Sequence, residues 1–486
     1  MFDITYLGRR CFGFMKRYPR TWAAVGLLVV FCLGIWAGRT IEFSKITGYF
    51  RSYTDPERSD VTKSVAQGIV HRQILDNGVL TNILSVSPDA VDIRPYRALS
   101  AGIGTESLVS LARRHKAFAA INGGFFEMSG TFRGESVGAL KIDGEWISEP
   151  EQGRAVIGFR TVDGKIEAYI DRIALLLELV LPNGETLPID GMNRSRGRSE
   201  LVVYRPHFHA ITLTMPDGIE VVVRDGAVTG IYDKQGSSHI PADGYILSAS
   251  GRKRADLLGH LKQGDVVEIR ETVIPERVGN SNLWASFAHI IGGGPLLLRD
   301  GIASLTQAYE HEGFDQAFHS FWHPRTAIGK KADGTLLFVT VTAAEAGVRR
   351  GVMLTRLSEL FLEWGATDAL NLDGGNSSML VIQDEVVSVK KADDAAKPGA
   401  DEAVSVKKVD AAAKPGAKDQ SQRVSRGRPS PGYADRPQQA SRGRSSAERA
   451  RGARNTRPAR GNRRIRPMPQ QQGRAIADAI LIFSKS

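Results

Sequence analysis

The sequence predicts an α+β fold, a β-rich domain of mixed sheets that carries a few packing helices. Between residues 156 and 274, short apolar segments are separated by Gly, Asp, Asn and Pro, which is the pattern of many short strands. The pairs Asp163-Gly164 and Asp225-Gly226 are typical of tight hairpin turns. With 486 residues, 42% of them hydrophobic, the chain is long enough to bury a sizeable core.

An eighteen-residue run near the N-terminus, residues 21–38, is uncharged and mostly apolar. As a helix it would be about 27 Å long at 1.5 Å per residue, close to the hydrocarbon thickness of a bilayer. Residues 1–20 carry five basic side chains against one acidic one, and Trp22 and Trp36 lie near the two interfaces. We therefore expect a single-pass anchor with a cytoplasmic N-terminus and an exported C-terminal domain. A cleaved signal peptide is the alternative, although its cleavage site would be poor.

Cysteine usage fits an exported domain that has no disulfide. Cys11 lies before the apolar run and Cys32 lies within it, so the exported part contains no cysteine. A polar stem, residues 39–67, follows the run. The folded domain is expected over residues 68–388 together with residues 473–486.

The first part of the domain is predicted to contain strands and one helix. Two strands are expected over residues 78–96, on either side of a turn at Pro88 and Asp89. A helix is expected to begin with Thr105 as its N-cap and to end in basic residues. The next apolar segment, residues 117–122, is predicted to be a strand that runs into a glycine loop.

A second group of elements leads to a carboxylate. Residues 289–301 and 323–341 add strands with glycines at their edges. A helix over residues 354–364 places apolar side chains on one face and ends at Gly365. It leads into the strand "ALNLD", whose last residue is Asp373. The glycines and serines that follow form a candidate site, or a plain turn between two strands.

Residues 389–472 are predicted to be a disordered insert. The segment 387–400 recurs as 404–417 with two mismatches and has no apolar face. Between residues 421 and 474 there are fifteen Arg and no Lys against two acidic residues, a net charge of +13 in a chain whose total is +11. Such a segment can contact polyanions, or it can be a plain spacer. The apolar stretch 475–483 is expected to return as the last strand of the domain.

Six short stretches carry a resemblance to a known family. They are "AAINGGFF" with the helix before it, "VGALKIDGEW", "IIGGGPLLLRDG", "HPRTAIG", "GATDALNLDGGNSSML" and the terminal "GRAIADAILIF". In this order and spacing the chain resembles the phosphodiester glycosidase domain family. That family includes N-acetylglucosamine-1-phosphodiester α-N-acetylglucosaminidase, the enzyme that uncovers mannose 6-phosphate, and many bacterial exopolysaccharide-associated proteins.

The resemblance implies hydrolysis of a sugar-1-phosphodiester at the glycosidic C1–O bond. Arg325 would bind the anionic leaving group through its fork of N–H donors. Asp373 would be the carboxylate that faces C1 of an oxocarbenium-like transition state, and Asn122 would hold a sugar hydroxyl or N-acetyl group. Glu127 is a candidate for the acid, although a charged residue at such a position is more often only solvated. The substrate-binding residues that the resemblance implies are Gly123, Gly124, Gly293, His323, Thr326, Asn371, Gly374, Gly375, Ser377 and Ser378.

Structural alternatives stay open for two of these residues, and no metal or cofactor is expected. Arg325 could be a partner in a core ion pair, and His323 could be a packed or hydrogen-bonding histidine. His207 and His209 would face the same side of a strand, but no third ligand is visible nearby. The glycine run at residues 292–295 lacks the Lys-Ser/Thr of a nucleotide-binding loop.

The loop after "LLFVTV" departs from the family pattern. The usual Asp-Gly-Arg is absent from "TAAEAGVRRGVML", although Gly351 and Met353 recover the pattern beyond it. Either Glu345, Arg349 or Arg350 takes over the missing role, or the substrate differs, or activity is lost.

The sequence therefore predicts a membrane-anchored, exported phosphodiester glycosidase that acts on envelope or exopolysaccharide glycans. The alternative is a glycan-binding or scaffold protein of envelope polysaccharide assembly. The polyanions that the insert could contact outside the cytoplasm are acidic polysaccharides and envelope phosphates, whereas nucleic acid is not an expected partner.

Overall fold

A computed structural model of the chain describes residues 58–151, 153–277, 281–314, 316–344, 351–388 and 475–485. The predicted cytoplasmic segment, the apolar run and the predicted insert lie outside these ranges. Within them, no helix has both the length and the apolar character that crossing a membrane requires.

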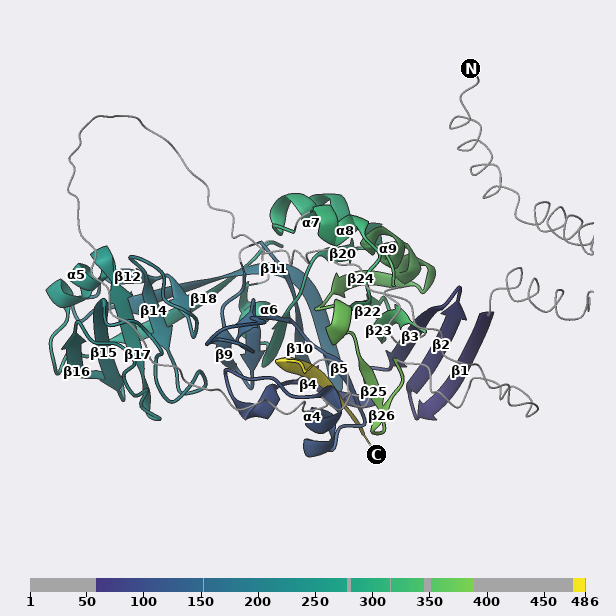
Figure 1. Cartoon of the computed structure of the whole chain (residues 1–486), viewed down its shortest axis with the longest axis horizontal. Helices are drawn as coiled ribbons and strands as arrows, with labels where there is room; N and C mark the ends of the chain where they lie inside the picture. The colour runs from purple at the N-terminus through teal and green to yellow at the C-terminus, as the bar shows by residue number, and fades with distance from the viewer. Residues whose placement is uncertain are drawn as a thin grey trace, which may run out of the picture. The chain divides into compact units, whose positions relative to one another are not determined.

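Four sheets contain most of the described strands (Figure 1). The eight-stranded sheet has the order β1 (Arg58–Ala66), β2 (Ile69–Asp76), β3 (Val79–Val86), β23 (Leu336–Ala343), β22 (Arg325–Lys331), β24 (Ala366–Asn371), β20 (Leu296–Arg299) and β21 (Ile302–Ala303). The seven-stranded sheet has the order β12 (Thr186–Ile189), β11 (Lys165–Val180), β10 (Ala155–Val162), β19 (His289–Gly292), β8 (Leu140–Ile142) and β9 (Glu145–Ser148), with β18 (Glu268–Pro275) also paired to β11. β1 extends the first sheet into the segment that the sequence assigns to the stem.

The two five-stranded sheets and a short hairpin complete the β-structure of the described residues. One sheet has the order β13 (Gly191–Met192), β14 (Leu201–Tyr204), β17 (Gly244–Ser250), β15 (Gly218–Arg224) and β16 (Ala227–Asp233). The other has the order β26 (Glu385–Val386), β25 (Leu380–Ile382), β5 (Ala119–Asn122), β27 (Asp478–Ser484) and β4 (Val91–Arg97). β6 (Phe125–Phe126) pairs with β7 (Ser136–Val137).

Antiparallel pairing dominates these sheets. The sequence predicted mixed sheets, but the parallel pairing in the described part of the chain is limited to β13 with β14. Hairpin connections account for part of this pattern, because two strands joined by a tight turn must run antiparallel. The hairpin turns predicted at Asp163-Gly164 and Asp225-Gly226 join β10 to β11 and β15 to β16. Both residues of each turn have positive φ, as the tight hairpin turn requires.

The helices are few and short. They are α4 (Leu108–Arg114), α5 (Gly251–His260), α6 (Ser281–Ala285), α7 (Leu305–His311), α8 (Gln316–Ser320) and α9 (Leu354–Glu363), with 3₁₀ turns at Ala98–Ser100 and Gly375–Ser377. α9 buries Leu354, Leu357 and Phe361, the face that the sequence predicted, and Gly365 follows it with a φ of 81°.

The predicted N-cap of α4 is wrong. The cap is Ser107, whose side chain accepts a hydrogen bond from the backbone N–H of Ser110. Glu106 cannot be helical, because its backbone forms an isolated bridge with Ile476. Its carboxylate also accepts hydrogen bonds from Leu99 N and Arg114. The first turn therefore starts after this anchored residue.

The strands that lead to the predicted site share one hydrophobic core. Ile121 of β5, Ile291 of β19, Ile328 of β22, Leu370 of β24 and Ile480 of β27 are all nearly or completely buried in the same cluster. β27, yellow in Figure 1, pairs with β4 on one side and β5 on the other. The predicted closing strand is confirmed, and it borders the strand that carries Asn122.

Candidate active site

The predicted motifs meet where four strands end or begin. β5 ends at Asn122, β19 ends just before Gly293, β22 begins at Arg325, and β24 ends at Asn371. Backbone hydrogen bonds join the loops that follow. Asp373 N donates to Gly123 O at 3.2 Å, and Gly294 N donates to Asn371 O at 2.7 Å. Segments that are far apart in the sequence therefore form one cluster of loops.

The side chain of Asn122 links the loops of this cluster by hydrogen bonds. Its side chain is buried, and Nδ2 donates to the backbone oxygen of Asp373 at 2.7 Å. Its Oδ1 accepts from Thr326 Oγ1 at 2.8 Å and from Met379 N at 3.1 Å. Three of its hydrogen-bonding positions are thus used within the protein. This arrangement supports a positioning role for Asn122 and leaves little of its amide for a sugar.

Asp373 is half-buried and is held on a fixed loop. Its Oδ1 accepts a hydrogen bond from Gly374 N at 2.9 Å. Gly375 N donates to Pro324 O at 2.9 Å, which fastens the loop to the residue before Arg325. A Cβ atom on Gly374 would lie 2.9 Å from the same Pro324 oxygen. The glycines are therefore needed for this close approach, and the turn that they form orients a carboxylate.

Asp478 is a second carboxyl group beside Asp373, and the sequence did not predict it. Its Oδ1 accepts from Gly124 N at 2.8 Å, and its Oδ2 accepts from Ser136 Oγ at 3.2 Å. Burial raises the pKa of Asp478 to about 6, and the neighbouring Asp373 carboxylate adds to the rise. A pair of interacting carboxyl groups, one of them titrating in the weakly acidic range, therefore lies on the two sides of Gly123.

A weak signal for Asp478 does exist in the sequence. It is the one charged residue in the apolar stretch 475–483, at the start of a strand that is otherwise buried. A buried, charged residue in a core strand needs partners or a function. The predicted insert separates Asp478 from every other motif, so sequence proximity could not reveal its neighbours.

Arg325 is a buried cation at the edge of the loop cluster. Its Nε donates to Val352 O at 3.3 Å, and its Nη2 donates to Phe318 O at 2.7 Å. Its guanidinium carbon lies 4.9 Å from the centre of the Phe318 ring. Burial lowers the pKa of Arg325 to about 10. Among the described residues no carboxylate forms an ion pair with it, so the core ion-pair alternative finds no partner there.

Among the described residues, three buried acceptors near the loops have no hydrogen-bond partner. They are Oδ1 of Asn371, whose side chain is fully buried, Oγ of Ser378, which is 8% exposed, and Oε2 of the buried Glu312, which lies against the Gly294 loop. The Nδ2 atom of Asn371 is used within the protein, because it donates to Gly294 O and Leu372 O. Buried polar atoms without partners are uncommon and are expected where a ligand or water binds. Ser377, next to Ser378, is also buried.

Glu127 and His323 lie at the margin of this arrangement. The backbone of Glu127 pairs with Glu135 and Gly134, and no described contact joins its side chain to Asp373 or Asn122. His323 is exposed, and its backbone forms an isolated bridge with Val352. Their predicted roles stay predictions. Residues 345–350 of the divergent loop lie outside the described ranges.

The pair His207 and His209 does not lie on a strand, so that expectation is wrong. β14 ends at Tyr204; His207 follows it in a turn, and His209 lies just beyond that turn. His207 pairs with Glu145, and His209 interacts with Ile211. Across the described ranges, no cluster of three or more potential metal ligands is found.

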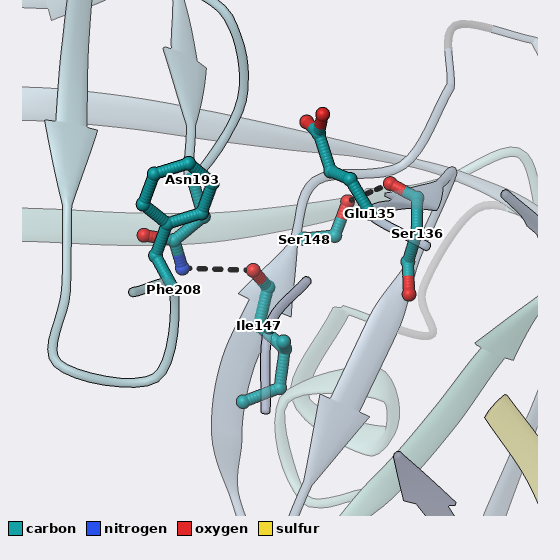
Figure 2. Close-up of a pocket in the computed structure, with 7 residues that line it drawn as sticks. Glu135, Ser136, Ile147, Ser148, Asn193 and Phe208 are labelled. Atoms are coloured by element: carbon teal, nitrogen blue, oxygen red, sulfur yellow. Dashed lines mark hydrogen bonds between the residues drawn. The ribbon is translucent and has the colours of Figure 1, made fainter. Parts of the chain in front are cut away.

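Figure 2 shows a pocket next to Ser136. Its lining residues are Gly102, Glu135, Ser136, Ile147, Ser148, Asn193 and Phe208. Ser148 Oγ donates to Ser136 O at 3.1 Å, and Asn193 Nδ2 donates to Ile147 O at 2.8 Å. None of the sequence-predicted site residues lines this pocket. Its link to the site is Ser136, which also contacts Asp478, and we therefore assign the candidate active site to the loops around Asp373.

Part of this arrangement lies in a segment that is similar to a known family. Residues 217–407 match the family model of the phosphodiester glycosidases. This part of the chain is similar to the phosphodiester glycosidase domain. The matched range includes Arg325 and Asp373, whereas Asn122 and Asp478 lie outside it. Asn122 is hydrogen-bonded directly to the matched segment, and Asp478 is linked to it through Gly123, whose backbone oxygen accepts from Asp373 N.

Similar proteins support the fold. An uncharacterized protein of Rickettsia conorii is 27% identical over 235 residues, which are 48% of this chain and 77% of that protein. A crystal structure of a hypothetical protein from Synechocystis superposes with a TM-score of 0.60 at 25% identity, covering 69% of this chain and 62% of that one. A crystal structure of a Burkholderia pseudomallei protein has a TM-score of 0.55 at 22% identity, covering 65% of this chain and 71% of that one. The chain thus spans somewhat less than two thirds of the Synechocystis chain.

Proposed function

We propose that this chain is a glycosidase that hydrolyses a sugar-1-phosphodiester at the C1–O bond. The observation that carries the proposal is the fixed carboxylate of Asp373, held through Asn122, Gly123 and Gly374 between strands of different sheets. The match to the phosphodiester glycosidases supports the same chemistry. The two unpartnered acceptors on Asn371 and Ser378 are suited to sugar hydroxyl donors.

The proposed reaction breaks the bond between C1 and the phosphate oxygen. Water supplies a hydroxyl group to C1, and its proton is taken up as the phosphate monoester leaves with the bridging oxygen. Positive charge develops at C1 in the transition state, and Asp373 stabilises it as nucleophile, base or fixed charge. A phosphate is a good leaving group, so strong protonation by an acid is not required. Arg325 would stabilise the negative charge on the departing phosphate.

Asp478 gives the proposed site its second carboxyl group. It contacts the Gly124 N–H and lies beside Asp373, so its protonation state changes the negative charge next to C1. Its side chain is only 2% exposed, which makes it a positioning residue that acts through Asp373 and the glycine loop. Ionisation of Asp478 above about pH 6 would increase the negative charge available to a cationic transition state.

The finer features of the function rest on the sequence. We propose that residues 21–38 anchor the chain in a membrane, with residues 1–20 cytoplasmic and the domain exported, and that the substrate is an envelope or exopolysaccharide glycan. The Arg-rich insert would contact acidic envelope polymers. Deletion of residues 389–472 should then weaken retention at the envelope while turnover is kept; loss of turnover would show that the insert belongs to the site.

A second candidate function is binding without hydrolysis. The family's Asp-Gly-Arg is absent from the loop after β23, and this favours a glycan-binding or scaffold protein of polysaccharide assembly. Turnover separates the two. The purified chain should release sugar from UDP-N-acetylglucosamine or a synthetic sugar phosphodiester, and Asp373→Asn should reduce the rate by at least about 100-fold. A wild-type protein that binds these compounds without releasing sugar would favour the second candidate.

A further inference from the structure

Two arginines stack on one cluster of phenylalanine rings beside the proposed active site. The guanidinium carbon of Arg154 lies 4.6 Å from the ring centre of Phe314 and 5.6 Å from that of Phe125. Phe314 stacks on Phe318 with ring centres 4.9 Å apart, and Arg325 lies 4.9 Å from the Phe318 ring centre. We call these five residues the Arg–Phe cluster.

The Arg–Phe cluster borders the loops around Asp373. Phe125 directly follows Gly124, whose N–H binds Asp478. A Cβ atom on Gly294 would lie 2.7 Å from the Phe314 ring, so this ring packs against the second glycine loop. Gly293 N donates to Ala155 O at 3.0 Å, which fixes the residue after Arg154 to the same loop. Both cations therefore belong to the walls of one loop cluster.

Both guanidinium groups are only partly compensated. Burial lowers the pKa of Arg154, an effect that Glu151 and Glu312 partly offset, and burial also lowers the pKa of Arg325. Arg154 Nε donates at 3.4 Å to the backbone oxygen of Glu312. The Glu312 carboxylate pairs with Arg172 through Oε1, whereas its buried Oε2 has no hydrogen-bond partner among the described residues. Across the described ranges, neither Arg154 nor Arg325 forms an ion pair with a carboxylate. Arg325 is buried and Arg154 is half-buried. A cation that is removed from water without a paired anion is costly, and an anionic ligand would reduce that cost.

A third stacked arginine shows what a structural role looks like in this fold. Arg160, on β10, lies 5.7 Å from the Phe287 ring centre. It also forms two hydrogen bonds with the Glu167 carboxylate, at 2.8 and 2.6 Å. Arg160 thus stacks on a ring and also pairs with a carboxylate. The two arginines of the Arg–Phe cluster stack on rings but donate hydrogen bonds to backbone oxygens. The difference indicates that the cluster leaves positive charge for a ligand.

We propose that Arg154 and Arg325 form a binding site for the phosphate-bearing leaving group of the substrate. This inference rests on the proposed function and adds Arg154 to it, a residue for which no role was predicted. Guanidinium groups suit phosphate oxygens because their planar N–H donors match them in pairs. The Phe314–Phe318 stack lies between the two cations, so they contact the leaving group at separate points, Arg325 at the phosphate that leaves C1 and Arg154 farther along.

Calorimetric titration of the full chain with dimethyl phosphate and with inorganic pyrophosphate tests the site without requiring turnover. Wild type should bind pyrophosphate more tightly than dimethyl phosphate, and salt should weaken both. Arg154→Met should weaken pyrophosphate binding by about 10- to 100-fold, the range expected for losing a charge-assisted hydrogen bond. Arg154→Lys should recover part of the loss, and Arg160→Met is the matched control that should bind as wild type does.

Two results would overturn the proposal. One is that Arg154→Met binds both anions as tightly as wild type; the other is that Arg160→Met weakens binding as much as Arg154→Met does. The proposed function fails separately, if wild type binds pyrophosphate through Arg154 and yet releases no sugar from any sugar phosphodiester. If turnover is present but Arg154→Met leaves both KM and kcat unchanged, the proposed function stands and the Arg154 site does not.

Discussion

Replacing Asp478 with Asn removes a buried ionisable group and keeps the acceptor for the Gly124 N–H. Burial raises the pKa of Asp478 from 3.8 to about 6. Between these pH values the folded chain holds a proton that the unfolded chain has released. The stability from this proton is fully present below the unfolded pKa, and it is lost as pH rises through the folded pKa of about 6.

The magnitude follows from the size of the shift. A rise of roughly two pKa units corresponds to about 3 kcal/mol of folding free energy. Little discount for solvent screening applies, because Asp478 is 2% exposed. Asn carries no charge, so Asp478→Asn should be more stable than wild type above about pH 7, by as much as about 3 kcal/mol. The difference should shrink towards about pH 4, where wild type is protonated.

Urea unfolding of the full chain, followed by tryptophan fluorescence from about pH 4 to about pH 8, measures this difference. Asp89→Asn, at an exposed position in a turn, is the matched control and should show no comparable pH dependence. If Asp478→Asn is less stable than wild type at about pH 8, or if its stability falls with pH as steeply as that of wild type, the reasoning from burial is refuted.

Two further substitutions test how the loops are held. Asn122→Ala should lower the free energy of unfolding by about 2–4 kcal/mol, because its three partners lose their hydrogen bonds. Asn183→Ala, at an exposed position, should change that free energy little. Equal effects of the two substitutions in urea unfolding would refute the role of Asn122 in holding the loops together. Gly123→Ala should reduce both stability and sugar release, because its Cβ would lie 2.0 Å from Asp478 Oδ1. A Cβ atom on Gly259 would have nothing within 4 Å, so the control Gly259→Ala should be neutral or stabilising. A Gly123→Ala variant with unchanged stability and sugar release would contradict the close packing at Gly123.

Local motifs were enough to predict several of the loops that meet around Asp373. The turns at Gly123 and Gly374 and the strand that begins at Arg325 are short patterns whose backbone requirements are visible in the residues themselves. Their meeting could be expected from the family resemblance. The hydrogen bond between Asn122 and the Asp373 backbone could not, since it joins positions 251 residues apart.

What the sequence missed depends on long-range contacts. The role of Asp478 depends on its hydrogen bonds with Gly124 and Ser136, which form because β27 pairs with β5. The role proposed for Arg154 depends on its contacts with the rings of Phe125 on β6 and Phe314 in the loop before α8. Thr105 was expected as an N-cap because it precedes a helical pattern, but the tertiary bridge of Glu106 delays the helix to Ser107.

Hydrolysis of a sugar-1-phosphodiester in heavy-oxygen water tests most directly how the loops around Asp373 act. If Asp373 stabilises charge at C1, the heavy oxygen will be found in the released sugar, and the phosphate monoester will contain none beyond background. The Asp373→Asn variant should release little sugar, so little labelled sugar should form. Heavy oxygen in the phosphate product, or undiminished sugar release by Asp373→Asn, would contradict glycosidic cleavage at this site.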